Sequence, residues 1–203
     1  MDAALERLLE GLIEFGRAHD ARRADRRERL RNVEAETAQM LSVLVRATRA
    51  GRVLEIGTSN GYSTLWLADA VADTGGRVTT VEVESERARL AQENFAGAKL
   101  QHLIDLRVGD GGQVLAESPD GAWDFIFLDA ERPHYVTYWP NLVRSLRPFG
   151  LLVVDNVLSH AEEVADFCAL VKGTSGITSA LVPIGAGALL ITKGAREDGA
   201  QRP

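Results

Sequence analysis

From Arg52 onward the chain alternates short strand-like runs with longer stretches of helical spacing. The runs RVLEIG and RVTTVEV are each followed by apolar residues that recur every three or four positions, which predicts helices over residues 62–72 and 85–100. The runs IDLRVGD, WDFIFLDA and GLLVVDN come next. Strands that alternate with helices need crossover connections. The pattern therefore predicts an α/β protein whose mainly parallel sheet is covered on both faces.

Both ends of the chain depart from this alternation. Near the end, ITSALVPIG and GALLITK are separated only by a short turn, which predicts an antiparallel hairpin at one edge of the sheet. Before the first strand, residues 1–50 show helical spacing and predict at least two extra helices. The periodic positions there are Leu5, Leu8, Leu9, Leu12, Ile13, Val33, Thr37, Met40, Leu41, Leu44 and Val45.

The length and apolar content set the number of domains. With 203 residues, of which 45% are hydrophobic, the chain is long enough for one domain with a sizeable core and short for two. We expect a single domain over residues 1–203. It would consist of a helical segment (1–50), a core (51–194) and a tail (195–203).

Charge and cysteine content narrow the possible partners and compartment. A net charge of −6 and a pI near 5.3 disfavour a surface built for polyanions. A single cysteine, Cys168, excludes an internal disulfide framework and suits a reducing compartment. The first 15 residues carry acids among their apolar positions and do not resemble a signal peptide. No stretch approaches the roughly 20 apolar residues that cross a bilayer. We therefore expect a cytoplasmic protein without a membrane segment.

Polar residues gather where the predicted strands end. In open α/β sheets, ligands bind beyond the carboxyl ends of the strands, beside the point where the strand order reverses. The residues at these ends are therefore the candidates for function. They are Glu55 to Ser63, Glu82, Asp110, Asp129 and the pair Asp155–Asn156.

The first strand runs into the glycine turn EIGTSNGYS and the start of a helix. Gly57 and Gly61 allow a ligand to approach the backbone closely, and a helix amino terminus favours a carboxylate or phosphate. The turn lacks both the G-x-G-x-x-G spacing and the G-K-[ST] ending, which disfavours NAD and ATP. Glu82 ends the second strand, where an acid accepts hydrogen bonds from ribose hydroxyls. A ribose without a pyrophosphate suggests S-adenosylmethionine.

The glycine turn and Glu82 also have a purely structural explanation. Glycines after strands are common turn residues, and a lone glutamate is often solvated. Three such features after three consecutive strands favour a cofactor site. We expect the amino-acid end of the cofactor near Gly57 and Ser63, and the adenine near residues 109–111. The candidate cofactor-binding residues are Val33, Glu55, Gly57, Thr58, Ser59, Gly61, Tyr62, Ser63, Glu82, Gly109, Asp110, Gly111 and Asp129.

Five motifs in order resemble a known family. They are VLEIGTSNGYSTLWLADAV, VEVESERARLAQENF, GDGGQVL, FLDAERPHY and GLLVVDNVL, and the resemblance runs from about Val33 to Lys193. Together they are similar to the class I metal-dependent O-methyltransferases related to caffeoyl-CoA and catechol O-methyltransferase. The resemblance implies a Rossmann-like seven-stranded methyltransferase fold with S-adenosylmethionine as donor, and usually a homodimer.

Asp129, Asp155 and Asn156 offer oxygen ligands at the ends of two strands. Two carboxylates and an amide oxygen suit a hard divalent ion such as Mg²⁺. In the family that the chain resembles, the matching residues bind this ion. Without a metal, the same acids would be solvated strand ends or would only orient the donor.

The implied reaction is in-line transfer of the sulfonium methyl group to a hydroxyl oxygen of a small acceptor. Two neighbouring hydroxyls of the acceptor would chelate the ion, which lowers the pKa of the attacking hydroxyl from a phenolic value of about 10. Most of the acceleration would come from positioning and charge. Asp129 would both hold the ion and face the charged donor.

The sequence departs from the family pattern after this aspartate. The family commonly has D-A-D-K, in which the lysine deprotonates the acceptor, whereas this chain has Asp129-Ala130-Glu131-Arg132. Arginine stays protonated in proteins, so Arg132 can stabilise a phenolate or bind an anionic substrate but cannot act as a base. The proton would leave to hydroxide on the ion, to Glu131 or to His134. Alternatively, these three side chains are ordinary loop residues.

The aromatic residues after this stretch fit the start of a helix. We expect at least two of Tyr135, Tyr138 and Trp139 to pack in the core, and Tyr135 to form an aromatic wall for the acceptor. His160 falls in the loop after Asn156 and is read as a surface histidine. The predicted catalytic residues are Asp129, Arg132 and His134, and the predicted substrate contacts are Arg132 and Tyr135.

The stretch from Arg17 to Arg31 holds seven arginines and three acids. It is read first as a solvated helix or linker with acid–arginine pairs. It could instead contact an anionic substrate or pack against a second subunit.

Three functions stay open. The leading one is small-molecule O-methylation of catechol-like or hydroxycinnamoyl acceptors. Methylation of a hydroxylated uridine in tRNA is favoured only by the arginines, and non-catalytic cofactor binding only by the missing lysine.

Overall fold

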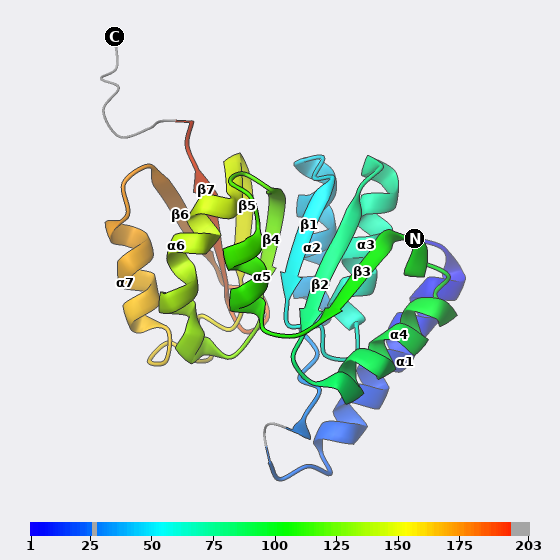
Figure 1. Cartoon of the computed structure of the whole chain (residues 1–203). Coiled ribbons are helices and arrows are strands. Elements are labelled where there is room, and N and C mark those ends of the chain that lie inside the picture. Colours follow the sequence, from blue (N-terminus) through cyan, green and yellow to red (C-terminus); the bar gives the residue numbers. More distant parts are fainter. Residues whose placement is uncertain (26–27, 196–203) are drawn as a thin grey trace.

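Seven strands form one sheet in the order β3-β2-β1-β4-β5-β7-β6 (Figure 1). The structure is a computed structural model and describes residues 1–25 and 28–195. The strands are β1 (Arg52–Ile56), β2 (Arg77–Glu82), β3 (Ile104–Val108), β4 (Trp123–Leu128), β5 (Leu146–Val154), β6 (Ile177–Val182) and β7 (Ala188–Lys193). The first five pair in parallel, and β7 runs antiparallel to both of its neighbours. The strand order reverses between β1 and β4.

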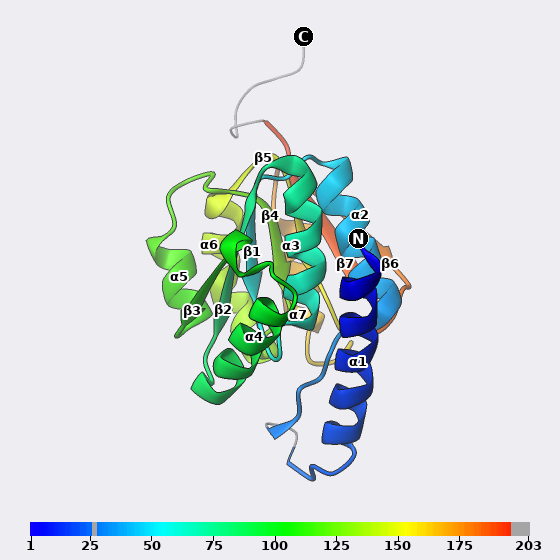
Figure 2. The same ribbon diagram turned by 90° about the vertical axis from the view of Figure 1, so that its right-hand side faces the viewer.

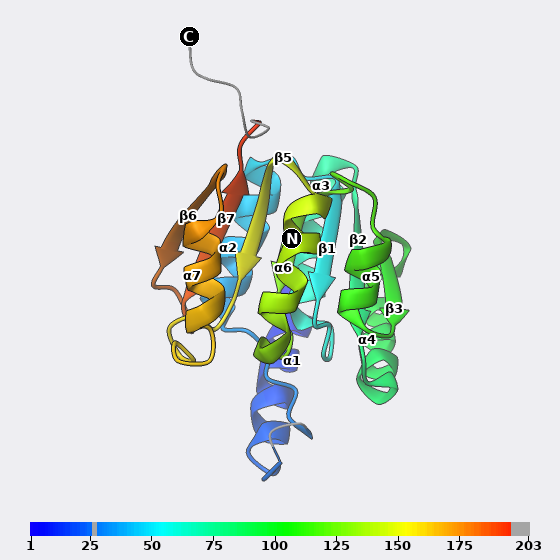
Figure 3. The same cartoon turned by 60° about the vertical axis from the view of Figure 1, so that its left-hand side comes forward.

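Helices cover both faces of the sheet (Figures 1 and 3). One face carries α1 (Ala3–Asp20), α2 (Ala35–Ala47), α3 (Tyr62–Thr74) and α4 (Ser85–Gly97), and the other carries α5 (Gly111–Glu117), α6 (Tyr135–Ser145) and α7 (Ala165–Gly173). Short 3-10 turns lie at Gln101–Leu103 and Arg132–His134. The predicted α/β fold with a mainly parallel sheet and extra amino-terminal helices is confirmed.

The central strands are buried on both faces, because successive side chains of a strand point to opposite sides. In β4, Phe125 and Phe127 pack toward α1–α4, whereas Ile126 and Leu128 pack toward α5–α7. All four side chains are fully buried. Two apolar layers therefore hold the middle of the sheet rigid, and its carboxyl edge has a firm support.

Helix α1 is the amphipathic helix that the leucine spacing predicts. It starts at Asp2, whose side chain accepts hydrogen bonds from the backbone N–H groups of Ala4 and Leu5, both at 2.9 Å. Its buried leucines join the layer under α3. The carboxyl end of α1 extends past the sheet on the side of the strand ends (Figure 2). The chain then returns toward that edge before α2 begins.

The structure corrects two predicted boundaries. Helix α4 ends at Gly97, and after a short turn Gln101–Leu103 form a 3-10 turn. Strand β5 begins at Leu146, earlier than the apolar run at Gly150, because Leu146 pairs with Trp123 across a register shift. The predicted antiparallel hairpin at one edge of the sheet is confirmed, with β7 between β5 and the edge strand β6.

The division into segments 1–50, 51–194 and 195–203 stays a prediction, and residues 196–203 of the tail lie outside the described residues. Over residues 1–25 and 28–195, no helix is both long enough and apolar enough to cross a membrane.

Candidate active site at the carboxyl ends of the strands

The backbone ladder of the sheet brings the polar strand ends into one row. The N–H groups of Gly57, Asp129 and Asp155 each donate to a carbonyl of the neighbouring strand, at 3.0, 3.0 and 3.2 Å. Beyond β2, the N–H of Gly109 donates to the Glu82 carbonyl at 2.9 Å. Side chains that are far apart in sequence therefore leave the sheet at the same edge, beside the reversal between β1 and β4.

A cavity of about 930 Å³ lies along this row. Ligand pockets usually measure about 300–1,000 Å³, so this one is at the upper end and can hold two molecules side by side. Most predicted site residues line it: Val33, Gly57, Thr58, Ser59, Tyr62, Ser63, Glu82, Gly109, Asp110, Gly111, Asp129, Arg132, His134, Asp155 and Asn156. The structure thus brings these positions together, and their binding roles stay predictions. Glu55, Gly61 and Tyr135 do not line the cavity.

Gly57 and Gly61 shape the turn between β1 and α3. Gly57 has a φ of +105°, and a Cβ there would lie 2.1 Å from the Asp129 carbonyl oxygen. Gly61 has a φ of +84°, and a Cβ there would lie 2.4 Å from the ring of Phe95. Only glycine meets both demands. Gly61 therefore serves close packing against α4, and its role as a cofactor contact stays a prediction.

The prediction of Glu55 as a cofactor contact is corrected, because its side chain lies beneath the cavity with no exposed surface. It accepts hydrogen bonds from the hydroxyls of Ser63 (2.6 Å), Thr80 (2.6 Å) and Thr64. Burial raises the pKa of Glu55 to about 7, although the three hydroxyls lower it. Glu55 ties the first turn of α3 to β1 and β2, and so fixes the helix amino terminus that faces the cavity.

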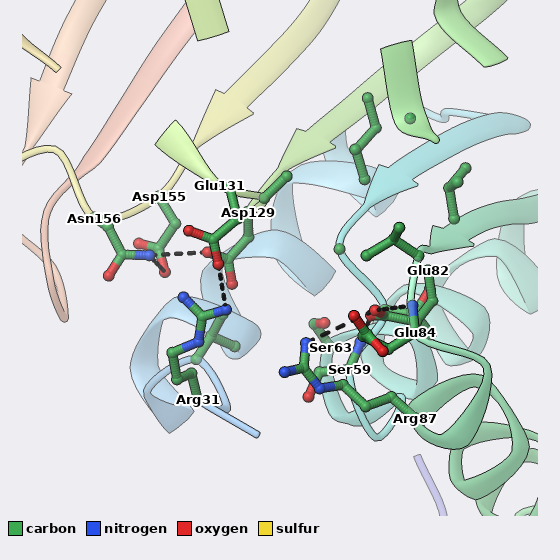
Figure 4. A pocket seen from close by; sticks show the side chains of 18 of the residues that line it. Arg31, Ser59, Ser63, Glu82, Glu84, Arg87, Asp129, Glu131, Asp155 and Asn156 are labelled. Atoms are coloured by element: carbon green, nitrogen blue, oxygen red, sulfur yellow. Dashed lines mark hydrogen bonds and ion pairs between the residues drawn. The ribbon is translucent and has the colours of Figure 1, made fainter. Parts of the chain in front are cut away.

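Glu82 presents a positioned carboxylate at the other end of the cavity (Figure 4). It accepts the backbone N–H of Ser59 at 2.8 Å and that of Glu84 at 3.0 Å, and Arg87 lies 3.8 Å away. A carboxylate offers about four lone-pair sites, so two N–H groups leave capacity for further donors. The side chain is 4% exposed, which fixes its orientation toward a ligand.

Asn60 lines the cavity within the stretch from Glu55 to Ser63, although it is not among the predicted cofactor-binding residues. Its side-chain oxygen accepts the backbone N–H of Tyr62 at 3.2 Å, which sets the orientation of the amide. Its Nδ2 is buried and makes no hydrogen bond within the described part of the chain. A buried donor without a partner is costly, and so it points to a ligand acceptor beside the start of α3. The loop gave no signal for it, because asparagine is common in turns.

Asp129 and Asp155 form an acid pair at the ends of β4 and β5 (Figure 4). Burial raises the pKa of Asp155, and the charge of Asp129 raises it further. Burial also raises the pKa of Asp129, while the guanidinium groups of Arg31 and Arg132 lower it. The Asp155 Oδ1 atom is buried and accepts no hydrogen bond from the described residues. A bound cation would remove both the repulsion and this unsatisfied acceptor.

Asn156 completes the predicted ligand set with a φ of +66°, a conformation that asparagine tolerates. Its Nδ2 donates to Asp129 at 2.9 Å and to Asp155 at 3.4 Å. If the nitrogen and oxygen of this amide exchange positions, the oxygen points toward Asp129 and Asp155. In residues 1–25 and 28–195 no three His, Cys, Asp or Glu side chains form a metal cluster. The predicted ligand set is not a group of that kind, because it contains only two carboxylates and its third ligand is an amide.

Arg132 is nearly buried, with a side chain 4% exposed, and its Nε donates to Glu163 at 2.7 Å. Glu163 belongs to the segment between β5 and α7, so this pair joins the two loops that carry the acids.

Two histidines line the cavity nearby. The ring of His134 stacks on Tyr138 with centroids 5.7 Å apart, and the Nδ1 atom of His160 lies 2.8 Å from the hydroxyl of Ser159.

The expectation that Tyr135 forms a wall of the acceptor site is corrected. Tyr135 has no exposed surface, packs edge-on against Phe167 at 5.5 Å and donates its hydroxyl to the Ala130 carbonyl. Trp139 packs against the same phenylalanine. Tyr138, on the adjoining helix face, lines the cavity. Tyr135 and Trp139 are therefore the two core aromatics of the three, as expected.

The segment before α2 forms a wall of the cavity, of which the sequence predicted only Val33 and, as an alternative, a substrate contact from the arginine-rich stretch. Arg29, Leu30, Arg31, Asn32 and Glu34 line it together with Val33. The arginine-rich stretch is partly paired, since Arg23 lies 3.6 Å from Glu28 and Arg31 lies 2.7 Å from Glu131. Arg26 and Arg27 lie outside the described residues.

The comparisons with known proteins agree with this geometry. A family model described as O-methyltransferase matches residues 9–174. The chain belongs to the O-methyltransferase family. A protein of Dictyostelium discoideum named "Probable caffeoyl-CoA O-methyltransferase 2" is 31% identical over 79% of this chain and 76% of its own length.

Catechol O-methyltransferase of Niastella koreensis is 35% identical over 63% of this chain. The matched part spans 58% of that relative, and 57% of a second catechol O-methyltransferase from Mycobacterium tuberculosis.

Solved O-methyltransferases share the fold. The enzyme from Bacillus cereus, solved with SAH, has a TM-score of 0.76 and 25% identity, covering 95% of this chain and 91% of that chain. The enzyme TomG from Streptomyces achromogenes, solved with SAM, has a TM-score of 0.76 and 28% identity, covering 96% and 91%.

Proposed function

We propose that this protein is an S-adenosylmethionine-dependent and divalent-metal-dependent O-methyltransferase for a small aromatic acceptor with neighbouring hydroxyls. One observation carries the proposal: a single cavity joins the Glu82 carboxylate to the acid pair Asp129 and Asp155. Methyl transfer requires a binding site for the donor next to a binding site for the metal-bound acceptor, and the two ends of this cavity adjoin in that way. The names of relatives that specify catechol and caffeoyl-CoA support this class of acceptor.

The donor end fits S-adenosylmethionine group by group. Asn60 Nδ2 and the amino terminus of α3 offer N–H donors to the amino-acid carboxylate. Glu82 offers acceptor positions to the ribose hydroxyls. Asp110 starts α5 beside Gly111, where the adenine would lie. SAM- and SAH-bound relatives of the same fold support S-adenosylmethionine as the donor.

The acid end fits a divalent ion, because the buried Asp155 Oδ1 lacks a partner among the described residues and the acids repel each other. Asp129, Asp155 and Asn156 would hold Mg²⁺ or a similar ion. When bound, the ion supplies positive charge that lowers the pKa of the acceptor hydroxyl and fixes its position.

The remaining polar residues of the chain act on charge and protons. Arg132 keeps its charge and, through Glu163, holds together the loops that carry the acids. It cannot take the proton of the acceptor hydroxyl. Glu131 and His134 line the same cavity, and either can accept that proton. Phe125 and Phe127, buried beneath, support the floor on which these groups sit.

The setting of the reaction is proposed from the composition of the chain and from its resemblance to the family. We propose a cytoplasmic enzyme that works as a homodimer, with a small molecule as acceptor. A tRNA acceptor is not favoured, because the described arginines of the basic stretch include Arg31, which faces the cavity and pairs with Glu131, and Arg23, which pairs with Glu28.

Binding measurements on two variants separate the two ends of the cavity. We expect Glu82→Ala to weaken SAH binding at least tenfold in calorimetry and to leave Mn²⁺ binding unchanged. Asp155→Ala should abolish Mn²⁺ binding measured by electron paramagnetic resonance and leave SAH affinity within about threefold. A tenfold change corresponds to about 1.4 kcal/mol, the size of one charge-assisted hydrogen bond.

The matched control is Asp120→Ala, an acid with an 84% exposed side chain that does not line the cavity. It should change neither affinity. Mn²⁺ binding that survives in Asp155→Ala, or SAH binding that survives in Glu82→Ala, would refute the corresponding assignment.

A further inference from the structure

Two arginines reach the acid end of the cavity, and they differ in their freedom to bind a ligand. Arg132 is 4% exposed and held by Glu163. The Arg31 side chain is 32% exposed, lines the cavity, and donates from Nη2 to Glu131 at 2.7 Å. Glu131 is itself 52% exposed. An ion pair in such contact with solvent contributes only about 0–1 kcal/mol, so a ligand carboxylate can replace Glu131 at little cost.

The backbone of Arg31 is held in place although its side chain is open to the cavity. The N–H groups of Leu30 and Arg31 donate to the carboxylate of Asp20 at 2.7 and 2.9 Å. The Leu30 carbonyl accepts the hydroxyl of Ser59 at 2.6 Å. Arg31 has a φ of +52°, which a bulky residue adopts only when its surroundings impose it. A guanidinium on a pinned backbone is a prepared anion site.

The cavity therefore has two poles at its acid end (Figure 4). Asp155 is 1% exposed and lies with Asp129 at the floor, where the neighbouring hydroxyls of an acceptor would bind. Arg31 points toward the acids from the opposite wall, and its charge lowers the pKa of Asp129. A molecule that lies between the wall and the floor meets a guanidinium at one end and the acid pair at the other.

We propose that the acceptor is an aromatic diol with a carboxylate on the far side of its ring, and that Arg31 binds this carboxylate. The inference rests on the proposed function and names the substrate class of the same site. The planar guanidinium matches a carboxylate through two parallel N–H groups, and binding displaces the side chain of Glu131. Arg31 thereby becomes a specificity-determining residue supplied by the segment before α2.

The test compares two acceptors that differ in one charge: 3,4-dihydroxybenzoate and its methyl ester. Their affinities are measured from the change in diol absorbance on the 203-residue chain with Mg²⁺ and SAH, and their turnover with S-adenosylmethionine. We expect the wild-type protein to bind the acid at least tenfold more tightly than the ester. Arg31→Gln should remove this preference by weakening the acid alone, and Arg31→Lys should restore part of it.

The matched control is Arg22→Gln, an exposed arginine of the same stretch that does not line the cavity. It should keep the full preference for the acid. SAH affinity, measured in every variant, shows that the fold is intact. Should Arg31→Gln fail to fold, Arg31→Lys takes its place and should keep only part of the preference for the acid, and an unchanged preference there overturns the role of Arg31.

Two failures are distinguishable. Equal binding and turnover of acid and ester by the wild-type protein, or an unchanged preference in a folded Arg31→Gln variant, overturns the role of Arg31 and leaves the methyltransferase intact. Absence of binding and transfer for both diols, in protein that binds SAH, overturns the proposed function together with this inference.

Discussion

At the scale of single residues, buried ionisable groups determine what the site can do. Glu55 holds the start of α3 from below through three hydroxyl groups. Asp155 leaves one oxygen without a partner among the described residues. Arg132 keeps a charge at a nearly buried position by pairing with Glu163. Each of these groups costs stability unless its environment compensates, so their gathering at one edge marks that edge as functional.

The pH dependence of stability tests the environment of Glu55. Its pKa in the folded protein, about 7, lies above the ordinary value of 4.5. The folded state therefore binds the proton more tightly, and the stability that this provides is complete below about pH 4.5 and disappears as the pH rises through 7. Glu55→Gln cannot titrate. We expect its free energy of unfolding, relative to wild type, to rise by up to about 3 kcal/mol between pH 5 and pH 8.

Urea unfolding at several pH values measures this difference. Asp120→Asn, with its carboxylate in solvent, is the control and should show no such trend. A constant difference between Glu55→Gln and wild type across the range would show that Glu55 is charged in the folded protein at pH 5.

At the scale of secondary-structure elements, the strand ends were predictable, whereas the amino-terminal wall was predicted only at Val33 and as one alternative for the arginine-rich stretch. Each apolar run stops at a polar residue, and parallel strands place their carboxyl ends at one edge. The sequence therefore predicts the row from Glu82 to Asp155. Arg31 and Glu131 meet across 100 positions of sequence. Nothing in either stretch signals the contact, because it depends on how the chain returns from α1.

The pair of Arg132 and Glu163 connects two elements and has a measurable coupling. It joins the turn before α6 to the segment before α7. A double-mutant cycle with Arg132→Met and Glu163→Gln should give a coupling free energy of about 1 kcal/mol in urea unfolding. The value is limited because half of the Glu163 side chain meets solvent.

The two single variants together should lose more free energy of unfolding than the double variant loses. The reason is that Glu163→Gln alone leaves a nearly buried guanidinium with a weaker partner. The corresponding exposed pair, Arg89 and Glu93 on α4, is the control and should give a smaller coupling. Strictly additive effects for Arg132 and Glu163 would show that the contact does not hold the two loops together.

At the scale of the whole molecule, a rigid sheet carries a donor end and an acid end in one cavity. The overall fold could be read from the alternation of strands and helices and from the resemblance to O-methyltransferases. The acceptor could not, because the wall that contains Arg31 comes from the amino-terminal segment, where local sequence predicts only helices and charge. The scaffold is thus shared with the O-methyltransferase family, and the wall that contains Arg31 is part of the cavity that this scaffold carries.

The most direct test of the central claim is transfer of an isotope-labelled methyl group. The protein is incubated with a 3,4-dihydroxyphenyl acceptor and with S-adenosylmethionine labelled in its methyl group. The masses of the products are then measured by mass spectrometry. With Mg²⁺ we expect one labelled methyl on an oxygen of the diol, and with excess chelator none. The 3-hydroxyphenyl analogue should stay unmethylated. Undiminished transfer in chelator, or equal transfer to the single hydroxyl, would contradict the account.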